Sequence, residues 1–116
     1  MGRDEHTPLV TVREENGRFL ITATGEMDLT EDDLFAAAWA EAHERALPVT
    51  VVDLSGVSFA DSALLNSLLD ARKHHAATGR TLVLAGPLRP AVTRLLELTG
   101  TLGHFTVTTS LAEALR

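Results

Sequence analysis

Cysteine is absent from the 116-residue sequence. This absence excludes a disulfide scaffold, a thiol nucleophile and any zinc or iron–sulfur site that depends on cysteine ligands. It is typical of a cytosolic protein, so we expect a cytoplasmic location. Lysine is almost absent as well, since Lys73 is the one lysine among ten basic residues.

Basic clusters and long apolar runs are also missing. Sixteen acidic residues against ten basic ones give a net charge of −6. An acidic chain of this kind is a poor candidate for binding nucleic acid, and no run approaches the roughly 18 apolar residues of a membrane span. Residues 1–8 carry no apolar signal-peptide region. We therefore expect a loose arm over residues 1–8 and a protein that binds neither nucleic acid nor membrane.

The length and the 45% apolar content fit one globular domain, placed at residues 9–116. Alternating apolar runs at 9–14 and 19–24 predict two strands. Asn16-Gly17 between them favours an antiparallel hairpin, because both residues tolerate positive φ. A nearly continuous β-branched run at 49–54 predicts a buried strand of a parallel sheet.

Helical spacing of apolar residues predicts helices between the later strands. The first is expected to start in a capping box over 30–33 and to end before Pro48. The others are expected at 61–77, from Pro90 to Gly100, and from Ser110, with further strands at 81–85 and 104–108. This order predicts an α/β fold with a mostly parallel sheet of four to five strands, an antiparallel first strand and about four helices.

The familiar catalytic motifs are missing, so we expect neither enzyme activity nor a cofactor. His74 and His75 occupy consecutive helical positions about 100° apart and cannot face one metal together. We expect both on a solvated face, His43 and His104 at the surface or an edge, and no metal site. Asp53 ends a central strand, where it either belongs to a site or caps the following loop.

The stretch VVDLSGVSFADSALLNSLL at 51–69 carries the strongest functional signal. A turn is expected at Gly56, Phe59 is expected to pack inward, and Asp61-Ser62 is expected to open a helix. A serine in the first helical turn lies among free backbone N–H groups at the positive end of the dipole, a place that accepts a phosphate. The alternative is that Asp61 or Ser62 is merely a helix cap.

Four segments together resemble the STAS-domain family of bacterial anti-sigma factor antagonists over residues 9–116: GEMDLT at 25–30, VVDLSGVSFADSALLNSLLDA at 51–71, GRTLVLAG at 79–86 and LRPAVTRLLELTG at 88–100. In that family a partner kinase phosphorylates the first serine after the aspartate, and this position is Ser62. The resemblance also implies that Asp28 lies near the phosphoserine loop.

Two residues depart from the family pattern, since Ala63 replaces a second serine and Leu64 replaces a glycine. Ser62 is therefore the remaining serine of its motif. We interpret Leu64 as a partly exposed residue of the partner interface; the alternative is that it is a fourth core leucine of its helix. The expected partner-binding residues are Asp28, Asp61, Ser62, Ala63, Leu64 and Asn66.

The resemblance implies a switch controlled by phosphorylation. The unmodified protein would bind an ATP-using serine-kinase anti-sigma factor and free a sigma factor, phosphorylation of Ser62 would end that binding, and a phosphatase would restore it. One alternative is a STAS module that does not switch and acts as a scaffold or decoy. Another is a small-ligand or nucleotide-binding STAS domain around Asp28, Asp53 and Ser62, against which the scarcity of basic residues argues.

Overall fold

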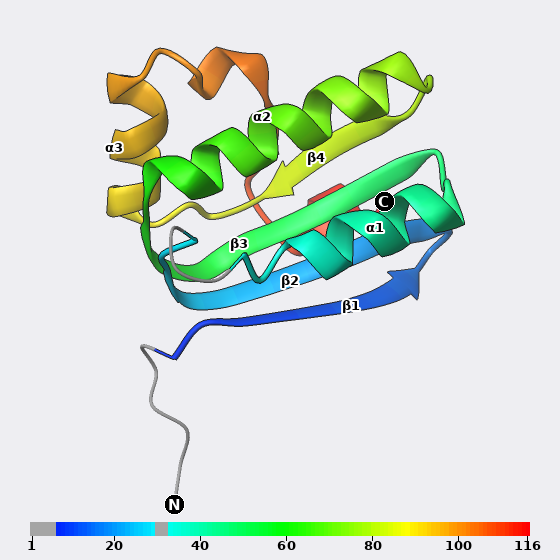
Figure 1. The fold of residues 1–116 in the computed structure, drawn as a ribbon, viewed down its shortest axis with the longest axis horizontal. Helices are drawn as coiled ribbons and strands as arrows, with labels where there is room; N and C mark the ends of the chain where they lie inside the picture. Colours follow the sequence, from blue (N-terminus) through cyan, green and yellow to red (C-terminus); the bar gives the residue numbers. More distant parts are fainter. Residues whose placement is uncertain (1–6, 30–32) are drawn as a thin grey trace, which may run out of the picture.

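The computed structural model describes residues 7–29 and 33–116. Its strands form one sheet in the order β1-β2-β3-β4-β5 (Figure 1). β1 pairs antiparallel with β2, and each later neighbouring pair is parallel. This confirms the α/β fold and mixed sheet predicted from the sequence. The strands are β1 (Leu9–Glu15), β2 (Arg18–Met27), β3 (Val49–Ala60), β4 (Thr81–Ala85) and β5 (Thr106–Thr108).

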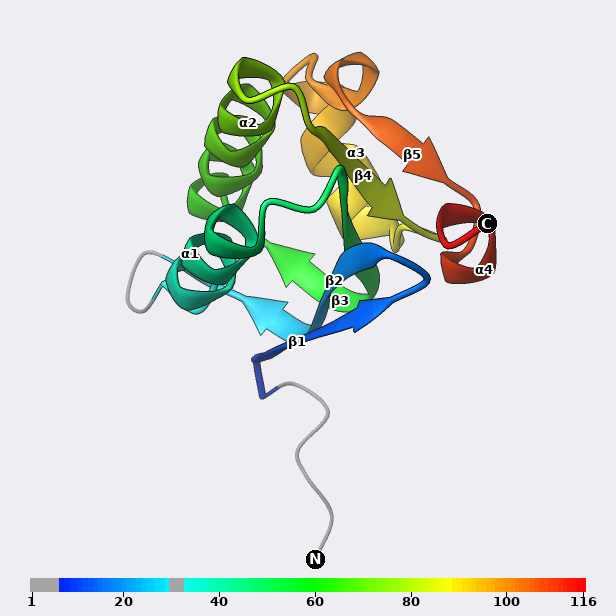
Figure 2. The same cartoon turned by 90° about the vertical axis from the view of Figure 1, so that its right-hand side faces the viewer.

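Helices cover both faces of the sheet. α1 and α2 lie on one face, and α4 lies on the other (Figure 2). The larger core packs side chains of α1, α2 and α3 against β2, β3 and β4, and a smaller core lies beneath α4. Within the described residues, no helix combines the length and apolar content needed to cross a membrane. The helices are α1 (Ala36–Arg45), α2 (Ser62–Ala77), α3 (Pro90–Leu98) and α4 (Leu111–Ala114), with a 3₁₀ turn at Leu102–His104.

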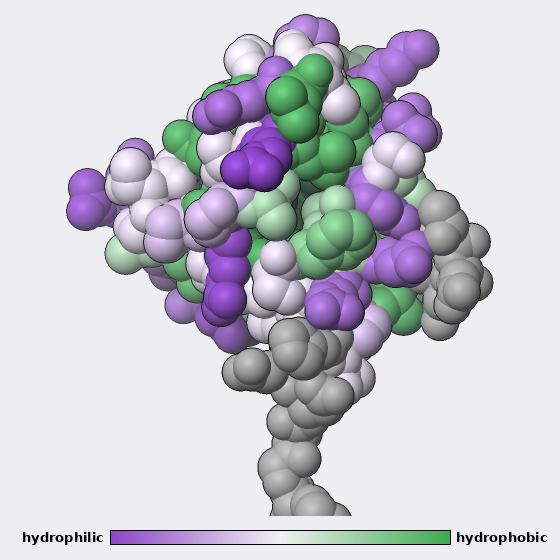
Figure 3. All heavy atoms as spheres, turned by 90° about the vertical axis from the view of Figure 1, so that its left-hand side faces the viewer, coloured by the Kyte–Doolittle hydropathy of each residue, from purple (hydrophilic) through white to green (hydrophobic). Residues whose placement is uncertain are grey.

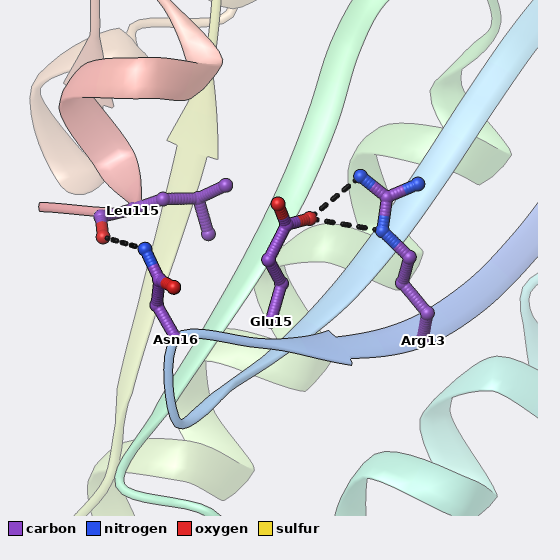
Figure 4. A network of polar contacts seen from close by, with 4 residues as sticks. All are labelled: Arg13, Glu15, Asn16 and Leu115. Carbon is purple, nitrogen blue, oxygen red and sulfur yellow. Dashed lines mark hydrogen bonds and ion pairs between the residues drawn. The ribbon is translucent and has the colours of Figure 1, made fainter.

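The predicted hairpin between β1 and β2 is confirmed. Asn16 and Gly17 have φ angles of 53° and 75°, both in the left-handed region that a tight hairpin turn requires. The Asn16 side chain also donates a hydrogen bond of 2.9 Å to the carbonyl of Leu115 (Figure 4). The turn therefore fastens the end of α4 to the first hairpin. Beside it, Arg13 and Glu15 form an exposed ion pair of 2.6 Å, a kind that contributes little stability.

β3 extends well beyond the predicted strand at 49–54. It continues to Ala60 and pairs with β2 as far as Met27, through two register shifts. The turn expected at Gly56 is therefore wrong, because the backbone stays paired there. A Cβ at Gly56 would lie 2.7 Å from Cγ2 of Thr24, so the glycine allows the close approach of the two strands.

α1 begins later than predicted, at Ala36. The expected capping box over 30–33 lies outside the described residues except for Asp33, whose carboxylate accepts a 3.0 Å hydrogen bond from the backbone N–H of Phe35. Phe35 precedes the helix, is buried, and stacks on Trp39 with ring centroids 5.4 Å apart. The boundaries predicted for the second and third helices agree with α2 and α3 to within one or two residues.

His75 is fully buried, so its expected position on a solvated face is wrong. It follows Ala71 by four residues and Leu68 by seven, which places it in the buried stripe of α2. Its Nδ1 donates to the Ala71 carbonyl at 2.7 Å, and its Nε2 accepts from the Thr50 hydroxyl at 2.8 Å. These partners satisfy the neutral ring, and burial lowers the pKa of His75.

His43, which was expected at the surface or an edge, is partly buried and lies against His74 and His75. Its ring centroid lies 3.8 Å from that of His74 and 5.4 Å from that of His75. Arg80 donates to Nδ1 of His43 at 3.0 Å, which fixes that nitrogen as an acceptor. Burial, and then the charges of the two histidines and the arginine, lower the pKa of His43.

Variants of Asn16 should separate its two roles, which are the left-handed backbone of the hairpin turn and the hydrogen bond to Leu115. Asn16→Ala places a Cβ without a polar end at a left-handed φ and removes the bond to Leu115, so we expect a loss of about 1–2 kcal/mol. Asn16→Gly removes the bond but tolerates the backbone, so it should lose less. Urea unfolding measures both, and equal losses would show that the left-handed backbone contributes nothing.

The free energy of unfolding should decrease as the pH falls below the ordinary histidine pKa of about 6.5. The unfolded chain binds protons there, while the lowered pKa values of His43 and His75 keep the folded rings neutral until the pH is lower. His43→Asn keeps an acceptor for Arg80 but does not titrate. Urea unfolding at several pH values between 7.5 and 5 should therefore show a shallower decline for this variant. A slope identical to that of the wild type would contradict the assignment.

Candidate phosphorylation and partner-binding site

Asp61 organises the junction between three elements. It has the extended backbone of a helix N-cap, and its Oδ1 accepts from the backbone N–H of Leu64 at 2.9 Å. Its Oδ2 accepts from the backbone N–H of Leu29 at 3.1 Å, and its own N–H donates to the carbonyl of Met27 at 3.3 Å. One residue thus joins the end of β2, the end of β3 and the start of α2.

Ser62 is the first residue of α2, and it is exposed. The helix is capped by Asp61, so the Ser62 hydroxyl is not required for capping. Ser62, Ala63 and Leu64 are uncharged, and they stand at the positive end of a 16-residue helix. A phosphate on Ser62 would lie beside backbone N–H groups of the first turn, which stabilise anions.

The other expected partner residues fall around this junction. Asp28 is exposed and directly precedes Leu29, whose N–H binds Asp61. Ala63 and Asn66 line a groove of about 480 Å³ between α1 and α2. Asn66 is exposed and Ala63 is half-buried. The structure therefore brings the predicted polar residues to one end of the molecule.

The groove also contains residues that the sequence patterns did not single out as functional. Trp39 forms part of its wall, and its Nε1 donates to Oγ of Ser67 at 2.7 Å. Asp70 and His74 line the groove further along α2. The apolar spacing around Trp39 indicates a helix and no functional role for this residue. The four-residue spacing of Asn66 and Asp70 was the available signal for a polar helix face.

Leu64 does not belong to this surface. It is 1% exposed and lies in the larger core, so its expected exposure in the partner interface is wrong. The reason is its place on the helix: Leu64 precedes Leu68 by four residues and Ala71 by seven, so it belongs to the buried face of α2. With Leu65 and Leu68 it forms the buried stripe, as the alternative interpretation stated.

Asp53 is a structural residue within β3. Its Oδ1 accepts from the backbone N–H of Ser55 at 3.0 Å and from the Ser55 hydroxyl at 2.7 Å. The carboxylate is thus used to cap the backbone where the β2–β3 register shifts. This supports the capping interpretation. Among the residues that the structure describes, no three acidic, histidine or cysteine side chains are grouped to hold a metal ion.

Phe59 points outward and is 49% exposed, which corrects the expectation that it packs inward. The register shift near Gly25 leaves Ser58 opposite no partner residue, and this extra residue reverses the facing of the next side chain. Phe59 borders an apolar hollow of about 450 Å³ that is shared with α3. Figure 3 views the molecule from the side where α3 and the start of α2 lie in Figure 1, and apolar side chains gather in its upper part.

A family model described as "Mlab, STAS domain" matches residues 10–108. The match covers most of the chain, and the protein belongs to the STAS-domain family. No curated protein matches the sequence closely enough to add a relative.

Solved structures with the same fold include anti-sigma factor antagonists. One from Mycobacterium paratuberculosis has a TM-score of 0.83 at 23% identity, over 97% of this chain and 94% of that chain. SpoIIAA in its unphosphorylated form has a TM-score of 0.76 at 18% identity, over 92% and 93%. The Bacillus cell fate determinant SpoIIAA in its phosphorylated form has a TM-score of 0.70 at 17% identity, over 92% and 96%. At these identities the similarity establishes the fold.

The burial of Leu64 predicts a large effect on stability. Leu64→Gly should cost about 3 kcal/mol or more, because it creates a cavity and also places glycine in a helix. Ala63→Gly, at the half-buried neighbouring position, controls for helix propensity and should cost about 1 kcal/mol. Urea unfolding measures both losses. A loss of about 1 kcal/mol for Leu64→Gly would be incompatible with its place in the core.

Proposed function

We propose that this protein is a cytoplasmic anti-sigma factor antagonist whose activity is controlled by phosphorylation of Ser62. In its unmodified form it binds a serine-kinase anti-sigma factor and frees the sigma factor that this partner holds. The kinase then phosphorylates Ser62 and the complex separates. A phosphatase restores the unmodified form.

The observation that carries this proposal is the placement of Ser62. The residue is exposed at the start of α2, and the neighbouring Asp61 caps the helix with its own carboxylate. The hydroxyl is therefore presented to a partner by a fixed backbone and is not itself needed for folding. The STAS fold and the anti-sigma factor antagonists among structures of similar fold support the choice of partner.

The proposed reaction belongs to the partner's active site. Oγ of Ser62 attacks the γ-phosphorus of ATP, the bond from that phosphorus to the β–γ bridging oxygen breaks, and ADP leaves. The hydroxyl proton passes to a base of the kinase. This chain contributes the acceptor and its orientation.

The switch follows from local charge. A phosphate adds about −1.5 to −2 charges at pH 7, beside the carboxylate of Asp61 and on a protein whose net charge is already −6. The start of α2 stabilises that anion in the free protein. In the complex the same charge must be desolvated against the partner, which costs far more than a new favourable contact returns. The fold is preserved while the interface is lost.

A second candidate function is a STAS module that binds a different regulator without switching. The matching family model carries the name Mlab and not that of the antagonists, and this favours the alternative. Ala63 and Leu64, which replace a serine and a glycine of the resembled motif, also favour it. Under this alternative Ser62 remains unmodified, and its negative variants bind normally.

Variants of Ser62 test the proposal. Each ATP-binding serine-kinase anti-sigma factor of the source genome is expressed and titrated against the full chain by calorimetry, then incubated with labelled ATP. Ser62→Ala should bind and take up no phosphate. Ser62→Asp should bind more weakly by about tenfold or more, with a thermal midpoint unchanged or slightly raised, since a carboxylate in the first helical turn is favoured by about 0.3–1 kcal/mol.

Thr11→Asp provides the matched control, since it adds the same charge at an exposed position of β1. It should bind like the wild type. Phosphopeptide mapping identifies the acceptor. Phosphate on Ser55, Ser58 or Ser67 with Ser62 unmodified would contradict the assignment, and the absence of any binding kinase would contradict the function.

A further inference from the structure

An apolar hollow lies next to the proposed acceptor. Phe59 and Ala60 at the end of β3 form one side of it, and Ala91, Leu95 and Leu98 of α3 form the other. Leu98 is 80% exposed and Phe59 is 49% exposed. Soluble monomers rarely expose large apolar side chains that lie next to each other. Such an exposed apolar surface is typical of a site that binds another molecule.

α3 carries two apolar stripes: one is buried, and the other reaches the core only through the partly buried Leu95. Val92 and Leu96 are buried in the larger core. Ala91, Leu95 and Leu98 recur at the spacing of a second helical face and line the hollow. A ridge of this spacing on a short helix is complementary to the ridges and grooves of another helix.

The hollow adjoins Ser62 along the chain, since Ala60 lines it and Asp61 alone separates the two residues. A specific complex buries about 800 Å² on each partner. An interface of that size centred on Ser62 extends into the hollow on one side and into the groove of Asn66 and Asp70 on the other. The hollow offers such an interface the most exposed large apolar side chains near Ser62, those of Phe59 and Leu98, whereas the groove mixes polar residues with Trp39 and Ala63.

Charge indicates what else the occupant carries. Arg94 is the charged residue among those described around the hollow, on a chain with a net charge of −6. A carboxylate on the occupant would pair with this exposed guanidinium. A second copy of the chain fits less well, because a two-fold contact centred here brings Arg94 toward the Arg94 of the other copy.

We propose that the anti-sigma factor docks an amphipathic helix in this hollow, with an apolar side chain between Phe59 and Leu98 and a carboxylate on Arg94. The proposal rests on the proposed function and names where the partner gains its affinity. The hollow supplies the anchor, and Ser62 at the start of α2 supplies the switch. Anchors of this kind are the residues whose truncation costs most in an interface.

The test uses the full chain and the kinase identified with the Ser62 variants. Leu98→Glu should raise the Kd by about tenfold or more, and Phe59→Ala should raise it similarly. Arg94→Glu should weaken binding more than Arg94→Ala does, and raised salt should reduce the difference between them. Val12→Glu is the matched control, because Val12 is also a partly exposed apolar residue, at 37% exposure on β1. It lies away from the site: it pairs with Ile21, and Ile21 is six residues along β2 from Met27, whose carbonyl accepts from the N–H of Asp61.

Thermal unfolding must show each variant folded, and Leu98→Glu and Val12→Glu should both melt near the wild type. Binding of Leu98→Glu and Phe59→Ala within twofold of the wild type, while Ser62→Asp fails to bind, would overturn the docking site and leave the proposed function standing. A wild-type dimer in sedimentation that Leu98→Glu converts to monomer, with kinase affinity unchanged, would assign the hollow to a second copy. The absence of any binding kinase would overturn both proposals.

Discussion

The geometry around Ser62 depends on two hydrogen bonds that the carboxylate of Asp61 accepts. Its two oxygens accept from the backbone N–H groups of Leu29 and Leu64, 35 positions apart in the chain, at 3.1 Å and 2.9 Å. A neutral amide at this position would offer a single acceptor, and one of the two N–H groups would lose its partner. The carboxylate thus fixes the loop after β2 against the start of α2. The exposure and direction of Ser62 follow from that constraint.

The position of Leu64 on the face of α2 that packs on the core explains how the chain accommodates leucine where the resembled motif has glycine. Because Leu64 precedes Leu68 by four residues and Ala71 by seven, its side chain lies on the buried face and fills the core at 1% exposure. Leucine in place of glycine therefore changes the core beneath the start of α2 and leaves the residues exposed there unchanged. The surface beside Leu64 consists of Ser62, Ala63 and Asn66: Ser62 and Asn66 are exposed, and Ala63 and Asn66 line the groove.

Local signals in the sequence predicted local structure well. Asn16-Gly17 specified the hairpin because the positive φ angles depend on those two residues alone. The outward position of Phe59 could not be predicted in this way, since it results from a register shift between two strands more than 30 positions apart. The burial of His75 fits the local spacing from Leu68 and Ala71, but a polar ring in the core also needs partners, and one of them, Thr50, lies 25 positions away in the chain. The order of strands and helices and the start of a helix at Asp61-Ser62 could be predicted from the sequence. The exposed hollow could not, because it forms only where α3 packs beside the end of β3.

An apolar hollow and the groove between α1 and α2 both lie near Ser62, and in the proposed function the hollow supplies affinity while Ser62 supplies control. Burial of the apolar hollow stabilises a complex in proportion to area and depends little on charge. In the proposed function, a phosphate at Ser62 would leave that contribution intact and act beside Asp61, which already carries a negative charge. Each tenfold change in affinity corresponds to about 1.4 kcal/mol, so a local electrostatic penalty of a few kcal/mol is enough to reverse the occupancy of the complex without altering the fold. A switch of this kind needs a rigid support for the acceptor, and the cap formed by Asp61 supplies it.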